Sequence, residues 1–351
     1  MSENSILEDV KKILEIAVFA PSGDNSQPWA FEVQGNVIRI LNVPEKDTSF
    51  YNFNQNANFI AIGALLENII IFSHYLKYDT QINIFPREDK KIVAEITLSE
   101  GQNVESYLYE YIKKRHTNRK PYFNQVIDIK FKEEVKRLNT ESIKFLINED
   151  EFTKSKIAEI ASLNEKIILE DKHMHNFLFE HITWNEAEDK EKKGFFVKTL
   201  ELKFPQFLAL KIFSSWRRLS FFKKFIPVSS FIAKENAKTY AKSGGFLAIT
   251  GKNLTPENFV EVGRLFQRAW LIITKNGLVA QPLTGITLLA IRCLLGGEDV
   301  LLKSHRDLVI DGYKKLKEYF HTKEEVIILL RVGYAPEVSS KTSRHSPIIK
   351  Y

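Results

Sequence analysis

The chain has 351 residues, of which 44% are hydrophobic and 27% charged, and its formal net charge is +6. These proportions are normal for a globular protein long enough for two structural units, and they exclude fibrous, collagen-like and disordered classes. The single cysteine, Cys293, allows neither an internal disulfide nor a cysteine-based zinc site, which predicts a reducing, cytoplasmic setting. We expect no secretion signal, because the first residues are polar and acidic, and no transmembrane helix.

The first hundred residues predict a helix, a hairpin, a second helix and a second hairpin. Ser5 and Glu8 form a capping-box pattern at the start of a helix that ends before Pro21. Alternating apolar residues on both sides of a Gly-Asn turn predict the first hairpin, from residues 29–33 and 37–43. The following elements are expected to be a buried helix at 58–76 and strands at 81–85 and 92–98.

After residue 104 the pattern becomes richer in helices. Helices are predicted at 105–114, 130–138 and 153–179. A strand at 246–250 precedes the best-marked helix, which Thr255 caps, Pro256 begins and Gly277 ends. A β-branched run at 325–334 predicts a fully buried strand. Because strands and helices interleave, the sequence predicts an α+β or α/β fold with a mixed sheet.

Several common catalytic motifs are absent from the sequence. There is no GxGxxG after a predicted strand, no GxxxxGK[ST], no GxSxG and no HExxH, which argues against dinucleotide, P-loop, serine-hydrolase and zinc-protease sites. A metal site could be drawn from His173, His175, Glu180 and His181. Histidines on an amphipathic helix are more often partly exposed surface residues than ligands, so we expect no metal.

The segment 20–29, Ala-Pro-Ser-Gly-Asp-Asn-Ser-Gln-Pro-Trp, is the first with chemistry of its own. Small residues such as Ser22 leave the backbone open to a flat ligand, while Asn25 and Gln27 offer paired donors and acceptors to an amide-like ring edge. The alternative interpretation is an ordinary loop between a helix and a strand.

The segment 115–119, Arg-His-Thr-Asn-Arg, is the second. Arg115 and Arg119 flank Thr117 and Asn118, a set that can grip a phosphate and put positive charge beside a reducible ring. The alternative is a solvated basic end to a helix.

Two further segments follow towards the end of the chain. The connection after Gly277 contains Gln281, Pro282, Leu283 and Thr284, and it could lay backbone amides along a cofactor edge or merely form a helix cap and turn. The last strand ends in Arg-Val-Gly-Tyr, and Arg344 follows in a polar tail. A tail arginine can reach back to an anion, although most are solvated.

Taken together and in this order, the four segments resemble the nitroreductase superfamily, in which an APSxxNxQPW loop is a signature. The arrangement resembles in particular the fused, single-chain branch typified by the Acg family, and the likeness spans residues 17–344. It implies an α+β, nitroreductase-like fold with mixed and antiparallel sheets flanked by helices, in two pseudo-related halves that we place at 1–104 and 105–351. It also implies one FMN per chain, in a monomeric pseudo-dimer or a homodimer.

The resemblance further implies roles for individual residues. Arg115, Thr117 and Arg119, with Asn118 between them, would hold the phosphate and the N1/C2 edge of FMN, and Arg344 would add charge at the phosphate. Ser22, Asn25 and Gln27 would lie along the isoalloxazine ring, and residues 281–284 would approach its opposite side. In two-chain nitroreductases the arginine-rich motif starts the protein, whereas here it follows the QPW loop. The sites in the two halves therefore need not be equivalent.

The function implied is an FMN-dependent oxidoreductase of nitroreductase type, which passes electrons from NAD(P)H or another donor to a nitro-like, quinone-like or unknown small-molecule acceptor. The main alternative is a non-catalytic protein that binds or stores FMN beneath a lid, for which residues 184–194 are the candidate. An enzyme that modifies a peptide or another cofactor is a third class, because fold does not fix function. We expect no nucleic-acid partner, since no known binding module is present.

The segment 203–242 fits none of these signatures. It contains nine Lys and Arg and one acidic residue, so its formal charge is +8 while the whole chain carries +6. Leu208, Ile212, Trp216 and Leu219 form an apolar helical stripe opposed by basic residues. This pattern predicts either peripheral contact with a membrane or a lid or docking helix with snorkelling basic side chains.

Overall fold

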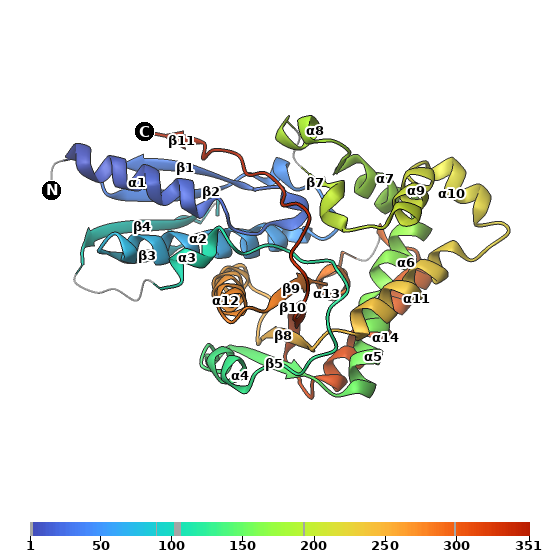
Figure 1. The fold of residues 1–351 in the computed structure, drawn as a ribbon. Coiled ribbons are helices and arrows are strands. Elements are labelled where there is room, and N and C mark those ends of the chain that lie inside the picture. Colours follow the sequence, from blue (N-terminus) through green and yellow to red (C-terminus); the bar gives the residue numbers. More distant parts are fainter. Residues whose placement is uncertain (1–2, 89, 102–106, 192–193, 298–299) are drawn as a thin grey trace.

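The computed structural model describes residues 3–88, 90–101, 107–191, 194–297 and 300–351, and it contains two larger sheets flanked by helices (Figure 1). The first sheet has the order β11-β1-β2-β4-β3. Its strands are β1 (Trp29–Gln34), β2 (Val37–Asn42), β3 (Tyr78–Ile84), β4 (Ile92–Glu100) and β11 (Ile349–Lys350). All its pairings are antiparallel except that of β1 with β11, which is parallel.

The second sheet has the order β5-β8-β10-β9, and all its pairings are antiparallel. Its strands are β5 (Ile143–Asn148), β8 (Gly245–Gly251), β9 (Val279–Pro282) and β10 (Glu325–Gly333). A further two-stranded sheet pairs β6 (Ile182–Thr183) with β7 (Phe195–Phe196). Almost every residue of β10 is buried, because helices cover both faces of this sheet, whereas β1 alternates between buried and more exposed positions.

Two long helices join the halves. Helix α2 (Asn56–Tyr75) packs on the first sheet, α12 (Pro256–Lys275) packs on the second, and the two helices pack on each other (Figure 1). A Cβ atom on Gly63 would lie 2.0 Å from the carbonyl oxygen of Val260, and one on Gly263 would lie 2.1 Å from that of Ile60. The two backbones therefore touch, in a reciprocal way, at a crossing that only glycine permits.

The two halves repeat one plan. Each sheet places its strands in the chain order first, second, fourth, third, and each has its long helix between the second and third strands. The second half carries insertions that the first lacks, between β5 and β8 and between β9 and β10. The α+β class and the two related halves expected from the sequence are thus confirmed.

The remaining helices flank this framework. They are α1 (Glu3–Ala17), α3 (Tyr109–Ile112), α4 (Ile129–Lys136), α5 (Glu151–Ala161), α6 (Leu163–Glu170), α7 (Lys172–Glu180), α8 (Glu186–Glu191), α9 (Phe204–Phe213), α10 (Trp216–Phe222), α11 (Val228–Ala241), α13 (Gly285–Leu294) and α14 (Lys303–Tyr319). Both predicted hairpins, the helix at 58–76 and the helix after Thr255 are present within a few residues of their expected limits.

Some predicted elements were wrong. The single helix at 153–179 is three helices, because the chain turns at Ser162 and again at Asp171, whose carboxylate caps α7 by accepting from the backbone of His173 and Met174. Strand β5 was missed. The first helix begins at Glu3, so Ser5 lies inside it. The predicted helix at 105–114 is α3 in its described part, and residues 105 and 106 lie outside the described residues.

One helical stretch, Phe53–Tyr75, is long and apolar enough to cross a membrane by length and composition. In this structure 89% of its most apolar window is buried inside the protein. The helix forms the centre of the larger hydrophobic core, and a buried core helix passes the same compositional test as a membrane span.

Candidate functional site

The loop at 20–28 has an unusual backbone. Asp24, Asn25 and Gln27 have positive φ angles of 46°, 58° and 50°, a region that non-glycine residues seldom occupy. The hydroxyl of Ser22 accepts a hydrogen bond of 3.0 Å from the backbone nitrogen of Gln27, which closes the turn. Such conformations cost free energy and tend to occur where a loop must present its groups to a ligand.

The C-terminal tail crosses this loop. The guanidinium of Arg344 donates to the side-chain oxygen of Asn25 at 2.6 Å, and the Asn25 amide donates to the carbonyl of Ser343 at 3.1 Å. The backbone nitrogen of His345 donates to the side-chain oxygen of Gln27 at 3.1 Å. Strand β11 then continues beside β1, so that the tail fixes Arg344 against the predicted ring-binding loop (Figure 1).

Arg115 lies close to the same place. Its side chain is buried, donates to the carbonyl of Phe19 at 2.8 Å and lies 4.5 Å from the ring centre of Trp270. Burial, with repulsion from Arg344, lowers the pKa of Arg115 to about 9. Burial also lowers the pKa of Arg344 to about 10, opposed by Asp189. Two guanidinium groups thus repel each other in a place where water cannot screen them.

Each of these two arginines has an unused donor. The Nε atoms of Arg115 and Arg344 are buried, and neither has a hydrogen-bond partner among the described residues. A buried cation without a partner costs several kcal/mol, by order of magnitude, so natural proteins pair such groups with an anion. The arrangement is that of a site for an anion held between Arg115 and Arg344.

Arg119 and Arg331 extend the positive charge. Arg119 donates to the carbonyl of Thr199 at 3.1 Å, and burial lowers its pKa. Arg331 is fully buried, donates from Nε to Gln281 at 2.8 Å and lies 4.0 Å from the ring centre of Tyr122. In the described part of the chain, neither of them, nor Arg115 nor Arg344, forms an ion pair with a carboxylate.

Acidic and phenolic groups face these arginines. Burial and the neighbouring Asp47 raise the pKa of Asp24 to about 6, while His181 and Arg119 oppose the shift. Burial raises the pKa of Glu165 to about 7, and the Tyr240 hydroxyl donates to this carboxyl at 3.1 Å. Titratable groups with strongly displaced pKa values gather at functional sites. Glu165 can therefore hold or release a proton near neutral pH.

The charges of both sets act on one another. Arg119 is among the charges that shift the pKa of Asp24, and Arg331 and Arg119 are among those that shift the pKa of Tyr240. Tyr51 reaches the same region, since its hydroxyl donates to Asn164 at 2.8 Å, next to Glu165. We refer below to Asp24, Tyr51, Arg119, Glu165, Tyr240 and Arg331 as the polar cluster.

The other predicted site residues line the second half. Thr117 pairs with Ala280, next to Gln281, whose side-chain oxygen holds Arg331. The amide of Asn118 is fully buried and donates to the carbonyl of Pro336 at 2.8 Å, which gives it a structural task.

Residues 282–284 make mostly backbone contacts. Pro282 belongs to β9, the backbone nitrogen of Leu283 donates to Leu329 at 2.7 Å, and the carbonyl of Thr284 accepts from Thr287 at 2.9 Å. The structure thus brings Ser22, Asn25, Gln27, Arg115 and Arg344 together, and connects 281–284 to them through Arg331 and the polar cluster.

Sequence reasoning missed Asp24, Glu165 and Tyr240. Asp24 stood within the quoted loop, and its positive φ is a preference that Asp and Asn share, so its position was a usable signal. Glu165 and Tyr240 come from α6 and α11, which belong to the insertion between β5 and β8. No motif marks either residue.

The candidate lid contacts the tail. The Asp189 carboxylate accepts from the backbone nitrogen of Ser343 at 3.1 Å, and its carbonyl accepts from the Ser343 hydroxyl at 2.8 Å. Thr199, which follows β7, accepts from Arg119. Residues 184–191 and 194–200 therefore lie beside two of the site's arginines, with α8 close to the tail (Figure 1).

The possible metal site is wrong. No group of three or more His, Cys, Asp and Glu in the described ranges lies close enough to hold a metal ion. His175 pairs with the carbonyl of Phe213 at 2.8 Å, and His181 with that of Phe177 at 2.7 Å. These histidines serve the packing of α7.

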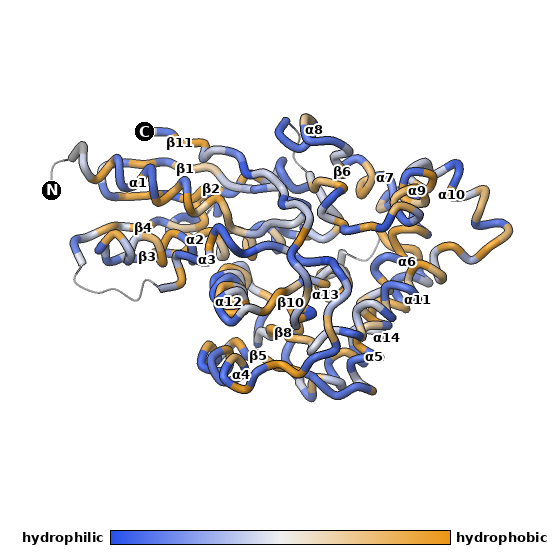
Figure 2. The backbone as a smooth tube through the Cα atoms, viewed as in Figure 1, coloured by the Kyte–Doolittle hydropathy of each residue, from blue (hydrophilic) through white to orange (hydrophobic). Residues whose placement is uncertain are grey.

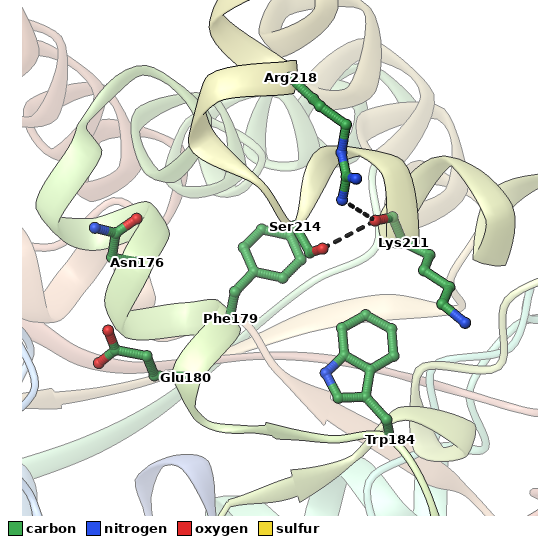
Figure 3. Close-up of a pocket in the computed structure, with 7 residues that line it drawn as sticks. All are labelled: Asn176, Phe179, Glu180, Trp184, Lys211, Ser214 and Arg218. Carbon is green, nitrogen blue, oxygen red and sulfur yellow. Dashed lines mark hydrogen bonds between the residues drawn. The ribbon is translucent and has the colours of Figure 1, made fainter.

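A separate cavity of about 600 Å³ opens between α7 and α9–α10 (Figure 3). Its lining residues are Asn176, Phe179, Glu180, Trp184, Lys211, Ser214 and Arg218. None of the arginines described above lines it, and Figure 3 shows Lys211 and Arg218 together on one side, linked by a hydrogen bond of 3.2 Å from Arg218 to the Lys211 carbonyl.

Comparisons with known proteins give weak likenesses only. No family model matches the sequence, and no curated protein matches it either. Among solved structures, oxidized iodotyrosine deiodinase bound to FMN and 3-iodo-L-tyrosine is 16% identical, with a TM-score of 0.39 over 70% of this chain and 98% of that chain. A nitroreductase with bound FMN from Bacteroides fragilis is 10% identical, with a TM-score of 0.36 over 68% and 95%.

The FMN-dependent nitroreductase NfnB from Mycobacterium smegmatis, in complex with NADPH, is 12% identical, with a TM-score of 0.35 over 67% of this chain and 97% of that chain. Scores of this size assign neither a family nor a ligand to this chain. Its chemistry has to be inferred from its own residues.

Proposed function

We propose that this protein binds FMN and is an oxidoreductase of the nitroreductase type. The observation that carries the proposal is the set of buried arginines around the 20–28 loop that have no carboxylate partner in the described chain. An anionic ligand with a flat polar ring satisfies both the unused guanidinium donors and the amides of Asn25 and Gln27. The order of the sequence motifs points to the same ligand.

The residues present fit FMN. Arg115 and Arg344, with Thr117, would hold the phosphate, and their buried Nε atoms are the donors that now lack partners. Arg119 would place positive charge at the N1/C2 edge. Ser22, Asn25 and Gln27 would lie along the ring, with residues 281–284 on its other side. When bound, FMN supplies the capacity to accept and pass on electrons or a hydride.

The chain itself would supply position, charge and a proton. The arginines favour a reduced, anionic ring, because opposite charge close to a group stabilises its ionised form. Glu165, with Tyr240 on its carboxyl, would donate a proton to the acceptor near neutral pH. We propose NAD(P)H or another small reductant as the donor, and a nitro-like or quinone-like molecule as the acceptor.

The test begins with the visible spectrum of the purified protein. We expect a flavin spectrum, and FMN in the supernatant after denaturation. NAD(P)H oxidation should then be measured with nitroaromatic and quinone acceptors. A colourless protein that also fails to bind added FMN would overturn the cofactor, whereas bound FMN without turnover on any acceptor would overturn the enzymatic part alone.

A second candidate is a protein that stores FMN without turnover. The contacts of Asp189 with Ser343 and of Thr199 with Arg119 favour it, because they hold the candidate lid against the site. A closed lid would shield the ring from NAD(P)H, although a small reductant such as dithionite could still enter. Reduction by dithionite but not by NADPH, in a variant with wild-type lid residues, would support storage. Equal reduction by both would exclude it.

A further inference from the structure

The connection between α10 and α11 exposes a cluster of large apolar side chains. Phe221, Phe222, Phe225 and Ile226 are 58%, 38%, 71% and 51% exposed. The segment projects from the body of the protein beyond α10 (Figure 1), and it is among the hydrophobic parts of the backbone in Figure 2. Apolar residues gathered in this way on a surface usually mark a site of contact with another molecule. We call residues 221–226 the apolar tip.

The apolar tip is held in place by the structure. Phe221 and Phe225 pack edge to face with ring centres 5.3 Å apart, and Phe222 packs on Phe213 at 5.7 Å. Leu219 and Val228, on either side of the tip, are buried. Lys223 donates to the carbonyl of Leu169 at 2.9 Å, which ties the tip to α6. Its aromatic rings are therefore displayed outward by a supported hairpin.

The surroundings of the tip are strongly basic. Residues 203–242 carry a formal charge of +8. Arg217, Lys224 and Lys234 are exposed, and none has an ion-pair partner within the described ranges. Lys211 and Arg218 add charge at the neighbouring cavity (Figure 3). A surface that combines exposed aromatic rings with unpaired cations matches the interface of a membrane with anionic headgroups.

We propose that the apolar tip docks this protein on an anionic lipid surface. Phe221, Phe225 and Ile226 enter the boundary between headgroups and acyl chains, and Lys224 and Arg217 bind the lipid phosphates. The stems of basic side chains can lie along apolar surface while their charges stay among the headgroups.

A lipid surface fits better than a protein partner. Stable protein interfaces bury about 800 Å² on each side, far more than a projecting hairpin with four apolar side chains presents. A second copy of this chain at the tip would bring two segments of charge +8 together, which Coulomb repulsion opposes. The inference does not depend on the proposed flavin chemistry, since no tip residue belongs to that site.

The first test is co-sedimentation of the purified full chain with vesicles. We expect binding to vesicles of phosphatidylcholine with phosphatidylserine, weak binding to phosphatidylcholine alone, and weakening by salt. The double variant Phe225→Ser/Ile226→Ser should lose at least about tenfold in affinity. The matched control is Phe152→Ser, because Phe152 is 67% exposed on α5, away from the basic segment, and it should bind like the wild type.

Charge is tested separately. Arg217→Gln/Lys224→Gln should bind phosphatidylserine vesicles about tenfold more weakly and with less dependence on salt. The control is Lys314→Gln/Lys315→Gln, two exposed lysines of α14, which removes the same charge elsewhere. Equal losses in both double variants would show a mere effect of net charge and would overturn the role of the tip.

Depth of insertion is tested with a label. A polarity-sensitive dye on Phe225→Cys, in a Cys293→Ser background, should shift to the blue when phosphatidylserine vesicles are added, whereas the same dye on Phe152→Cys should not. The proposal is wrong if the wild type does not bind anionic vesicles, or if the Phe225→Ser/Ile226→Ser variant binds them equally well. It is also wrong if the tip instead causes lipid-independent dimerisation, seen by sedimentation velocity and abolished in that variant.

Discussion

Arg115 and Arg344 come from distant parts of the chain, yet each lowers the stability of the other's charge. Arg344 is one cause of the lowered pKa of Arg115, and burial is the larger one. A fold that keeps such a pair, with two buried Nε atoms unused, sacrifices stability for binding. The pair therefore makes opposite predictions for stability and for affinity, and this separates a ligand site from a structural role.

For Arg115→Met we expect the flavin-free protein to gain stability, by about 1 kcal/mol, because a repelled buried charge is replaced by an apolar stem of similar length. FMN affinity should fall at least about 100-fold, since a charge-assisted contact to the phosphate is lost. Urea unfolding and titration by flavin fluorescence measure the two effects. Arg137→Gln, at an exposed arginine, should change neither. Loss of stability with unchanged FMN affinity would assign Arg115 to the fold alone.

Glu165 predicts a dependence of stability on pH. Burial raises its pKa from 4.5 to about 7, so the native state binds more protons than the unfolded state between these values. The contribution of Glu165 is full below about pH 4.5 and is lost as the pH rises through about 7. Asp24, raised from 3.8 to about 6, acts in the same direction at lower pH.

In Glu165→Gln the free energy of unfolding should therefore decline less between about pH 5 and pH 8. At the upper end the flavin-free variant should be more stable than the wild type by about 1 to 3 kcal/mol. Urea unfolding across this range checks the prediction. Glu318→Gln, at an exposed carboxylate of α14, should follow the wild-type curve. Parallel curves for wild type and Glu165→Gln would contradict the displaced pKa.

At this scale the sequence was informative where a motif existed. Ser22, Asn25, Arg115 and Arg344 could be named because their spacing is a known pattern, and the structure brings them together. Glu165 could not be named, because its carboxyl becomes unusual only through burial between α6 and α11. A long-range environment of this kind leaves no local pattern in the sequence.

At the scale of elements, the crossing of α2 and α12 determines how the two sheets stand to each other. Its closeness depends on Gly63 and Gly263, each facing a carbonyl oxygen of the partner helix. The crossing also carries polar contacts, among them the hydrogen bond of 2.7 Å from Gln267 to Asn68. A backbone obstacle cannot move as a side chain can, so any Cβ at these positions must separate the helices.

Gly263→Ala should therefore destabilise the protein by about 3 kcal/mol, although alanine is the better helix former. Gly277→Ala is the control, because that site has no atom within 4 Å of the added Cβ and differs only by its positive φ of 70°. We expect it to cost about 1 kcal/mol. Guanidinium unfolding midpoints compare the two. A smaller loss for Gly263→Ala than for Gly277→Ala would mean that the helices can separate freely.

Prediction of the elements succeeded where periodicity and caps agreed, as in α12 with Thr255, Pro256 and Gly277. It failed in the insertion of the second half. The apolar spacing runs on through Ser162 and Asp171, so one long helix was expected, and the cap that Asp171 forms on α7 was overlooked. Strand β5 was missed because β-strands depend on partners such as β8 that lie far away in the chain.

For the molecule as a whole, the repeated plan of the two sheets explains why one site is expected per chain. The plan alone would generate two equivalent places, but insertions modify the second half, and the tail returns only to the first. The tail brings Arg344 to Asn25 and Ser343 to Asp189, so it joins the candidate lid, the 20–28 loop and the first sheet. Its removal should open the site without dissolving either core.

Deletion of residues 337–351 should leave a folded protein, because both hydrophobic cores end before this segment except for Ile349, which packs at the edge. FMN affinity should fall about 100-fold through loss of Arg344, and bound FMN should leave faster, because Asp189 loses both contacts to Ser343. Deletion of 347–351 alone is the matched control. It removes β11 and uncovers the edge of β1, but it keeps Arg344 and its bond to Asn25.

Stopped-flow release of FMN and fluorescence titration distinguish the two deletions. If tail residues act through the site, only the longer deletion weakens binding, and Arg344→Ala in the full chain reproduces the loss of affinity with a smaller increase in the release rate, because the contacts between Ser343 and Asp189 remain. If the shorter deletion weakens binding equally, the tail acts by supporting β1 and the 20–28 loop, and Arg344 is not a ligand of the phosphate. The difference between Arg344→Ala and the longer deletion then measures how much the lid contact slows release.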